Sequence, residues 1–318
     1  MVIMNKKVVC LGLLVTDIIA KPVKKLPEKG KLELVDDIVL SFGGCAAICA
    51  INMAKMGADV TLIGKVGKDV FGDYMLSQLK DKGVHTEGIT RSEKCHTSAS
   101  CVIVGEDGER SFLHSVGANG MFCYEDVDFD VIQQNDIVFI GGTMLMPKFD
   151  GKDAAKVLKK SQEMGKFTVL DTAWDSQGRW MNVLKPCMEY IDLFMPSIDE
   201  AVELTGGRYT DPAEISRYFM DLGCKNVVIK LGDKGCYLHT GQGQEKLVPS
   251  FKVQAVDTTG AGDSFVSGFL TGLSKGWDFD RCAVFANAVG ANCVMDIGTN
   301  GVKSFEQIEQ FIAERTRE

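Results

Sequence analysis

Short runs of apolar residues alternate along the chain with longer stretches in which apolar residues recur every third or fourth position. The runs are typical of buried β-strands, and the stretches are typical of amphipathic helices. The expected strands are residues 8–13, 60–63, 137–140, 168–171, 191–195 and 227–231, and the expected helices include 45–56 and 71–82. This alternation predicts an α/β fold with a doubly wound, mainly parallel sheet flanked by helices.

Two segments depart from that pattern, because residues 31–40 and 97–114 alternate apolar and polar side chains. The second contains Glu106-Asp107-Gly108, a strong hairpin-turn signal. We expect a small antiparallel sheet that stands off the main one as a lid, formed by segments of about 14–42 and 95–117. An edge hairpin of the main sheet is the alternative. No repeat or linker interrupts the chain, so residues 1–318 are expected to form a single α/β domain.

The composition restricts the class of protein. With 318 residues, of which 45% are hydrophobic and 25% charged, the chain can bury a large core. Its net charge of -8 argues against nucleic acid as a partner. Eleven cysteines without a CxxC pair predict reduced, mostly buried thiols in a cytoplasmic protein. The N-terminal apolar stretch meets Asp17 too early for a signal peptide, and no apolar run reaches the ~18 residues that span a membrane.

The segment with the clearest chemistry runs from Val253 to Leu273. We expect a short strand, then a turn of small residues, then a helix with an apolar residue at every fourth position. The turn residues are Gly260, Ala261 and Gly262. Small residues let a ligand approach the backbone, and the first N–H groups of a helix have no helical partners. Together these features predict an anion-binding site.

Asp263 follows this turn directly. A carboxylate there can accept the proton of an attacking hydroxyl, which is the main chemical task of a kinase side chain. The alternative is that Asp263 only complements the helix dipole. Other common phosphate-binding motifs, GxxxxGK[ST] and GxGxxG, are absent from the sequence. The histidines fit no metal-binding spacing, so we expect surface or core roles for His85, His96, His114 and His239.

The string from Asp257 to Leu270 resembles the C-terminal motif of the ribokinase family, the PfkB-type carbohydrate kinases, and the resemblance extends over nearly the whole chain. It implies an ATP-dependent, Mg²⁺-dependent kinase that phosphorylates a hydroxyl of a sugar or sugar derivative. Asp263 would be the general base, and the turn before it would stabilise the transferring phosphoryl group.

The same resemblance implies an acceptor site. Asp17, near the end of the first strand, matches the aspartate that binds substrate hydroxyls, and a carboxylate can accept hydrogen bonds from two adjacent hydroxyls. Gly43 and Gly44 match the glycine pair that packs against the sugar. The family usually has Asn four residues later, whereas this chain has Ile48. Isoleucine cannot bind a hydroxyl, so we expect Ile48 to affect the choice of acceptor.

Three further segments resemble nucleotide-side motifs of the family. The first contains Ser197, where Asn is usual, and Glu200, which is implicated in organising Mg²⁺ through water. The second is a strand and turn that would place Lys230, Gly232 and Gly235 near ATP, although a plain hairpin is the alternative. In the third segment, Asn287 is a candidate contact to the adenine base.

Some relatives bind a monovalent cation, and the matching positions here are Asp257, Thr259, Cys293, Asp296 and Gly298. Carbonyl and carboxylate oxygens suit a hard cation such as K⁺.

Three functions compete. The first is phosphorylation of a sugar or sugar derivative. The second is phosphorylation of a nucleoside, because the apolar Ile48 would suit a base. The third is a non-catalytic sugar-sensing protein, which would have no need of Asp263. The expected partners are ATP and a small acceptor. A homodimer through the lid is also expected. In the lid strand, Val102 and Val104 point to one face and Ile103 to the other, so both faces are apolar and need to be covered.

Overall fold

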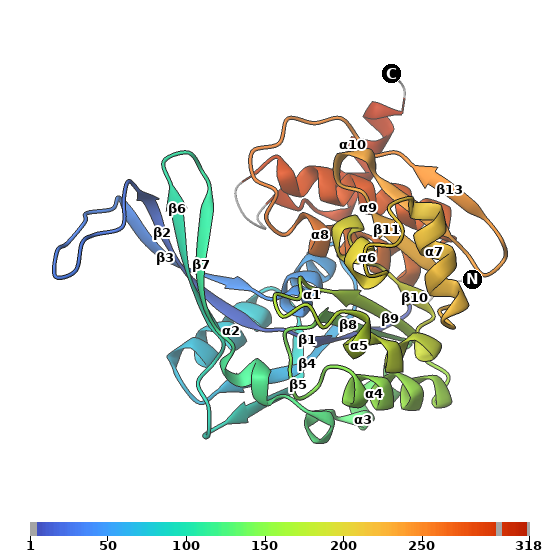
Figure 1. Ribbon diagram of the computed structural model, residues 1–318, viewed down its shortest axis with the longest axis horizontal. Coiled ribbons are helices and arrows are strands. Elements are labelled where there is room, and N and C mark those ends of the chain that lie inside the picture. The colour runs from blue at the N-terminus through green and yellow to red at the C-terminus, as the bar shows by residue number, and fades with distance from the viewer. Residues whose placement is uncertain (1–4, 297–300, 317–318) are drawn as a thin grey trace.

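The computed structural model describes residues 5–296 and 301–316. In this part of the chain, nine strands form one large sheet in the order β13-β12-β11-β10-β9-β8-β1-β4-β5 (Figure 1). All adjacent pairs from β11 to β5 are parallel, and β12 and β13 add an antiparallel edge. The predicted sheet is therefore confirmed. Its strands are β1 (Val8–Gly12), β4 (Val60–Gly67), β5 (His85–Ser92), β8 (Ile137–Thr143), β9 (Phe167–Thr172), β10 (Leu193–Phe194), β11 (Val227–Lys230), β12 (Cys236–His239) and β13 (Glu245–Val248).

Helices cover both faces of the large sheet. One face carries α1 (Cys45–Lys55), α2 (Val70–Asp81), α8 (Ala261–Ser274) and α9 (Phe279–Val294), and α10 (Phe305–Arg315) packs on α9. The other carries α3 (Phe129–Gln133), α4 (Lys152–Glu163), α5 (Met181–Leu184), α6 (Ile198–Leu204) and α7 (Pro212–Asp221). Successive side chains of a buried strand therefore enter opposite cores, as Cys10 and Leu11 do.

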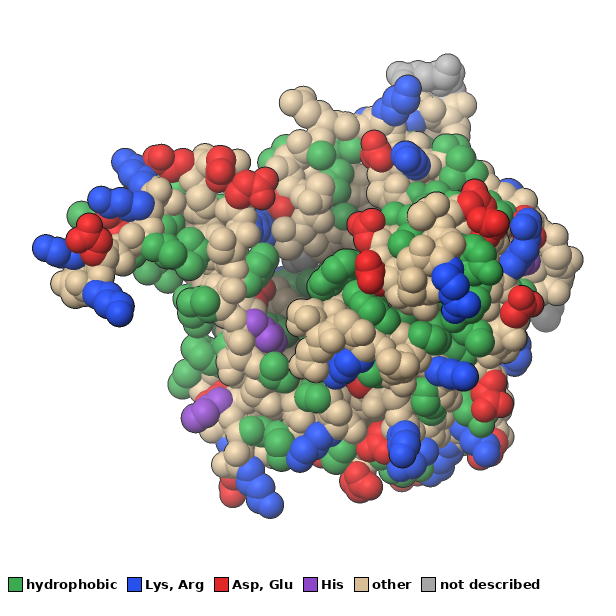
Figure 2. Space-filling model, viewed as in Figure 1, with side chains coloured by type: hydrophobic (Ala, Val, Ile, Leu, Met, Phe, Trp, Pro, Cys, Tyr) green, Lys and Arg blue, Asp and Glu red, His purple; other side chains and the backbone are tan. Residues whose placement is uncertain are grey.

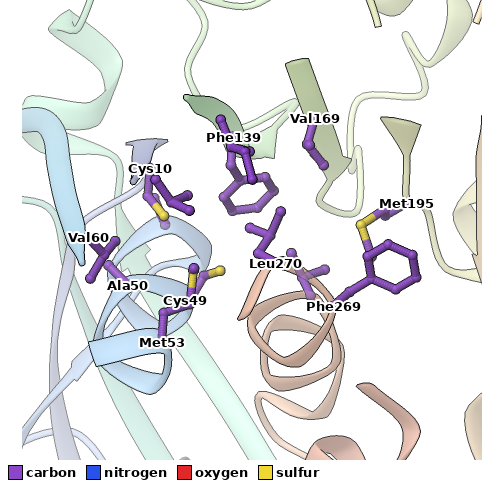
Figure 3. Packing of buried hydrophobic residues seen from close by; sticks show 14 of the residues in the cluster. Cys10, Cys49, Ala50, Met53, Val60, Phe139, Val169, Met195, Phe269 and Leu270 are labelled. Atoms are coloured by element: carbon purple, nitrogen blue, oxygen red, sulfur yellow. The ribbon is translucent and has the colours of Figure 1, made fainter. Parts of the chain in front are cut away.

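The core between the sheet and α8 explains why α8 forms. Phe265, Phe269 and Leu273 recur one helical turn apart and are buried, as the sequence predicts. Figure 3 shows Phe269 and Leu270 of this helix packed beside Val169 and neighbouring strand residues. The helix begins after Gly260, whose φ of 74° is left-handed and therefore favours glycine.

A second sheet of four strands stands off the large one (Figure 1). Its order is β3-β2-β6-β7, and β2 pairs with β6 in parallel, so the expectation of a purely antiparallel sheet is wrong. The turn at Glu106–Gly108 joins β6 to β7, as predicted. The strands are β2 (Val15–Val23), β3 (Asp37–Gly43), β6 (Ala99–Gly105) and β7 (Arg110–Ser115).

One expected strand forms only in part, and another does not form. The segment 31–40 enters the small sheet only from Asp37, the first residue of β3, and residues 31–36 lie exposed before it, with Leu32 and Leu34 uncovered. Residues 253–256 precede the glycine-rich turn without joining a sheet, because the N–H groups of Val256 and Asp257 donate to the carbonyl of Val294 at the end of α9. In both cases the alternation of residue types was present but a neighbouring strand was not.

The two faces of the small sheet differ in chemistry. The pairing register places Asp17, Ser100 and His114 in a row on one face, which we call the inner face. A row of apolar side chains crosses the opposite, outer face: Ile18, Leu40, Cys101 and Leu113. Figure 2 shows hydrophobic side chains gathered on this sheet and a hollow between the sheet and the body of the molecule.

All eleven cysteines are free thiols, and seven are buried. Within residues 5–296 and 301–316, no helix is long and apolar enough to cross a bilayer.

Candidate active site

A cleft of about 1100 Å³ opens at the carboxyl ends of β9 and β11 and at the first turn of α8. Ligands commonly bind at this edge of a parallel sheet. The cleft brings together most of the residues singled out in the sequence: Ser197, Glu200, Lys230, Gly232, Gly235, Gly260, Ala261, Gly262, Asp263 and Asn287. Its lining does not include Asp17, Gly43, Gly44 or Ile48.

Lys230 is one of the residues that line this cleft. Its Nζ donates to both carboxylate oxygens of Asp171, at 2.8 and 2.7 Å, and the two side chains are only 12% and 2% exposed. The sequence analysis did not identify Asp171. The available signal was its place near the carboxyl end of β9, where polar residues of a parallel sheet reach the ligand-binding edge.

Glu200 is fixed at the start of α6. Its Oε2 accepts hydrogen bonds from the hydroxyl of Thr172 at 3.1 Å and from the N–H of Ser197 at 3.0 Å. The Ser197 hydroxyl accepts from the N–H of Glu200 in return, which completes a capping box. Ser197 therefore orients Glu200 toward the cleft.

The charges around Lys230 act on one another. Burial works to lower the pKa of Lys230, but the carboxylates of Asp171 and Glu200 outweigh it and raise that pKa above its ordinary value. Burial raises the pKa of Asp171 to about 7, and the charge of Lys230 opposes this rise. A Cβ built on Gly262 would lie 3.7 Å from the Lys230 Nζ. The ammonium group thus lies beside the predicted anion-binding turn.

Asp263 occupies the first turn of α8 and is partly buried beside the same charges. Burial raises its pKa, while the charge of Lys230 and a hydrogen bond from the Cys45 thiol oppose the rise. A raised pKa makes a carboxylate a better proton acceptor near neutral pH. Cys45, the first residue of α1 after the glycine pair, is a contact that the sequence analysis missed.

Asp17 lies against Gly43 on the inner face of the small sheet. A Cβ on Gly43 would come within 2.5 Å of the Asp17 Oδ2, so a larger residue there would force the Asp17 carboxylate to move. Burial raises the pKa of Asp17 to about 6, although the Ser100 hydroxyl and the charge of Arg110 oppose the shift. Ile48 is 7% exposed in the second turn of α1. Asn52, one turn further, is buried and donates to the Ser264 hydroxyl at 3.1 Å.

An ion pair connects the small sheet to the segment that leads into the Gly260–Gly262 turn. Arg110 of β7 bonds to the carboxylate of Asp257, 147 residues later, and both side chains are largely buried. The other oxygen of Asp257 accepts the N–H of Thr259 at 3.0 Å. The small sheet is therefore held against the residues that precede the Gly260–Gly262 turn.

The remaining predicted residues have structural contacts. The Asn287 amide donates to the carbonyls of Val248 and Pro249, and the Cys293 thiol lies 3.6 Å from the Thr259 carbonyl. Asp296 ends the described segment after α9, and Gly298 lies outside the described residues. No cluster of three or more His, Cys, Asp or Glu in the described ranges could hold a metal. The acidic residues Glu200 and Asp263 in the cleft fit a Mg²⁺ ion held chiefly by phosphate oxygens and water.

Comparison with protein families matches residues 5–304 to the pfkB family carbohydrate kinase model. The ribokinase of Staphylococcus aureus is 29% identical over 315 residues, covering 96% of this chain and 100% of that protein. Two solved structures share the fold. Arabidopsis thaliana ribokinase in complex with ribose and ATP aligns with a TM-score of 0.84 at 23% identity, covering 97% of this chain and 99% of that one. A Methanocaldococcus jannaschii nucleoside kinase aligns with a TM-score of 0.81 at 21% identity, covering 97% and 98%.

Proposed function

The chain belongs to the pfkB family of carbohydrate kinases, and on that premise we propose that it transfers the γ-phosphoryl group of ATP to a hydroxyl of a sugar or sugar derivative. The observation that carries the proposal is the position of Asp263. Its partly buried carboxylate follows the Gly260–Gly262 turn and shares a cleft with Lys230. One carboxylate can then receive the hydroxyl proton while adjacent N–H groups face the migrating phosphoryl group.

The other cleft residues suit the nucleotide. Lys230 supplies positive charge beside Gly262, and Gly232 and Gly235 expose backbone at the turn after β11. Mg²⁺, when bound, would neutralise the phosphate charge, with Glu200 binding it through water. Asn287 would contact the base through its amide oxygen, because its NH₂ group is already bonded. A monovalent ion such as K⁺ would lie near Asp257, Thr259, Cys293, Asp296 and Gly298.

The acceptor would bind between the small sheet, acting as a lid, and the catalytic turn. Asp17 and the backbone of Gly43 and Gly44 would hold its hydroxyls, with Ile48 nearby. A nucleoside is the second candidate acceptor, because an apolar Ile48 leaves a less polar pocket that suits a base. The same chemistry serves both acceptors.

The test is an ATP-consumption screen of the purified protein with Mg²⁺ against pentoses, hexoses, sugar acids, sugar phosphates and nucleosides. Acceptor-dependent ADP release with one sugar class is the expected result. ADP release with nucleosides alone would select the second candidate. A rate that no acceptor raises above the acceptor-free background would overturn the proposal.

The pH dependence tests the role of Asp17. We expect kcat/KM for the acceptor to fall as the pH drops through about 6, because protonated Asp17 can no longer accept two hydrogen bonds. Since the pKa of Asp263 is also raised, the acidic limb should approach a slope of two. In Asp17→Asn the slope should decrease to one, with a lower kcat/KM throughout. An unchanged slope would show that Asp17 does not titrate in acceptor binding.

The outer face of the small sheet predicts a homodimer. Leu40 and Leu113 are 48% and 67% exposed in its apolar row, and such a surface is normally covered. We expect a dimer at micromolar concentration in analytical ultracentrifugation and a monomer for the double variant Leu40→Glu, Leu113→Glu. Leu247→Glu, at an exposed site on β13, is the control and should remain dimeric. A monomeric wild type would disprove the dimer.

A further inference from the structure

A row of three hydrogen-bonding side chains crosses the inner face of the small sheet. Asp17 of β2 pairs in register with Ser100 of β6, and Ser100 pairs with His114 of β7. Side chains directly opposite on one face are close enough to bond. The Ser100 Oγ lies 3.0 Å from the Nδ1 of His114, and the Ser100 hydroxyl also bonds to the Asp17 carboxylate.

The direction of these bonds determines the tautomer of His114. A serine hydroxyl has one hydrogen, and the acceptor-only carboxylate of Asp17 takes it. Ser100 must then accept from His114, so Nδ1 carries the ring proton. Partial burial lowers the pKa of His114, which favours the neutral ring at neutral pH. The Nε2 of His114 consequently has a lone pair and acts as a hydrogen-bond acceptor.

His114 also faces the catalytic turn. Arg110 lies four residues earlier on the same strand, so both side chains project from the same face. Arg110 reaches Asp257, and Asp17 packs against Gly43, two residues before the Cys45 that bonds to Asp263. The face that carries His114 is therefore directed at the space around the general base, and the imidazole is exposed there.

We infer that His114 is a specificity-determining residue, whose Nε2 accepts a hydrogen bond from an acceptor hydroxyl other than those bound by Asp17. The inference rests on the proposed kinase function. Strands are about 4.8 Å apart, so the α-carbons of Asp17 and His114, two strands apart, are separated by about 10 Å. The two side chains would bind hydroxyls that are not adjacent. The preferred acceptor is then a polyhydroxylated sugar rather than a compound with a single diol.

Two substitutions separate contact from positioning. His114→Asn keeps a donor where Nδ1 lies but removes Nε2, whereas His114→Gln places a polar group near Nε2 and loses the bond to Ser100. We expect His114→Asn to raise the acceptor KM by roughly two- to tenfold, the effect of one hydrogen bond, and to leave the KM for ATP unchanged. His114→Gln should have an acceptor KM closer to that of the wild type. The opposite ranking would mean that His114 only orients Ser100, and it would overturn the inference.

The assay uses D-ribose, D-fructose and their deoxy analogues with saturating ATP and Mg²⁺. A deoxy analogue that lacks the bound hydroxyl should have the same KM with the wild type and with His114→Asn. If His114→Asn raises the KM of every analogue as much as that of the parent sugar, the inference is contradicted. The control is His85, exposed on β5, where the Asn and Gln substitutions should change neither KM.

One measurement does not depend on turnover. Long-range ¹H–¹⁵N correlation spectra of the histidine rings should show His114 as the neutral Nδ1–H tautomer at neutral pH, and Ser100→Ala should remove this preference. A predominant Nε2–H tautomer would disprove the inference even if sugars are phosphorylated. If the tautomer is as expected but no sugar is used, the proposed function fails and the acceptor-binding role fails with it.

Discussion

Asp263→Ala is expected to lower kcat by at least ~10²- to 10⁴-fold, the range for loss of a general base. Asp263 lies in the first turn of α8, and burial raises its pKa toward the range in which a carboxylate can receive a proton at neutral pH. ATP should bind to the variant at least as tightly, because a negative charge beside the phosphates is removed. Steady-state kinetics with the best acceptor and equilibrium binding of ATP measure the two effects.

The isosteric variant Asp263→Asn should be nearly as inactive as Asp263→Ala. Asparagine fills the same volume but cannot take up the proton, so this result would show that the loss of activity is not caused by a cavity. Asp233→Asn is the matched control, because this exposed acid also lines the cleft but lies in the turn after β11. It should retain most of the activity. Turnover near the wild-type rate in either Asp263 variant would remove this residue from the mechanism.

Lys230→Gln is expected to affect both stability and activity. Its ammonium neutralises Asp171, whose side chain is 2% exposed, and removal of one partner of a buried ion pair typically costs about 3–5 kcal/mol. The glutamine would leave Asp171, Glu200 and Asp263 without the adjacent positive charge, so the KM for ATP should rise and kcat should fall. Urea denaturation and steady-state kinetics measure these changes.

A double variant distinguishes the two roles of the lysine. Asp171→Asn together with Lys230→Gln removes both charges, so it should recover much of the stability but little of the activity. Lys68→Gln is the control, because Lys68 pairs with Glu93 at 2.6 Å and the two side chains are 51% and 75% exposed, and such exposed pairs contribute little to stability. A stable, active Lys230→Gln protein would contradict both the electrostatic and the catalytic role.

The sequence alone predicted the parallel sheet and the helix that carries Asp263. Both predictions depend on local patterns. Phe265, Phe269 and Leu273 lie one turn apart, and the small residues before Asp263 are consecutive in the chain. Both features are local, so a helix preceded by a glycine turn can be predicted without knowledge of the tertiary structure. The resemblance of residues 257–270 to the carbohydrate kinases is likewise confirmed by the match over residues 5–304.

Local patterns were less informative where a strand needs a neighbour. Residues 31–36 and 253–256 have strand-like composition, yet the first is exposed and the second pairs with the end of α9. Strand β2 was not identified as a separate element, and its parallel pairing with β6 was not foreseen. The pairing partner of a strand depends on the whole topology, which periodicity does not encode.

The contacts that complete the site were decided by the tertiary structure. Asp171 and Lys230 are 59 residues apart in the chain, and Arg110 and Asp257 are 147 apart. The row that includes His114 exists only because β2, β6 and β7 are neighbours in register. The sequence by itself placed the Gly260–Gly262 turn next to Asp263, because these residues are consecutive in the chain. Only folding determined which distant charges surround it, because strand order and register set those distances.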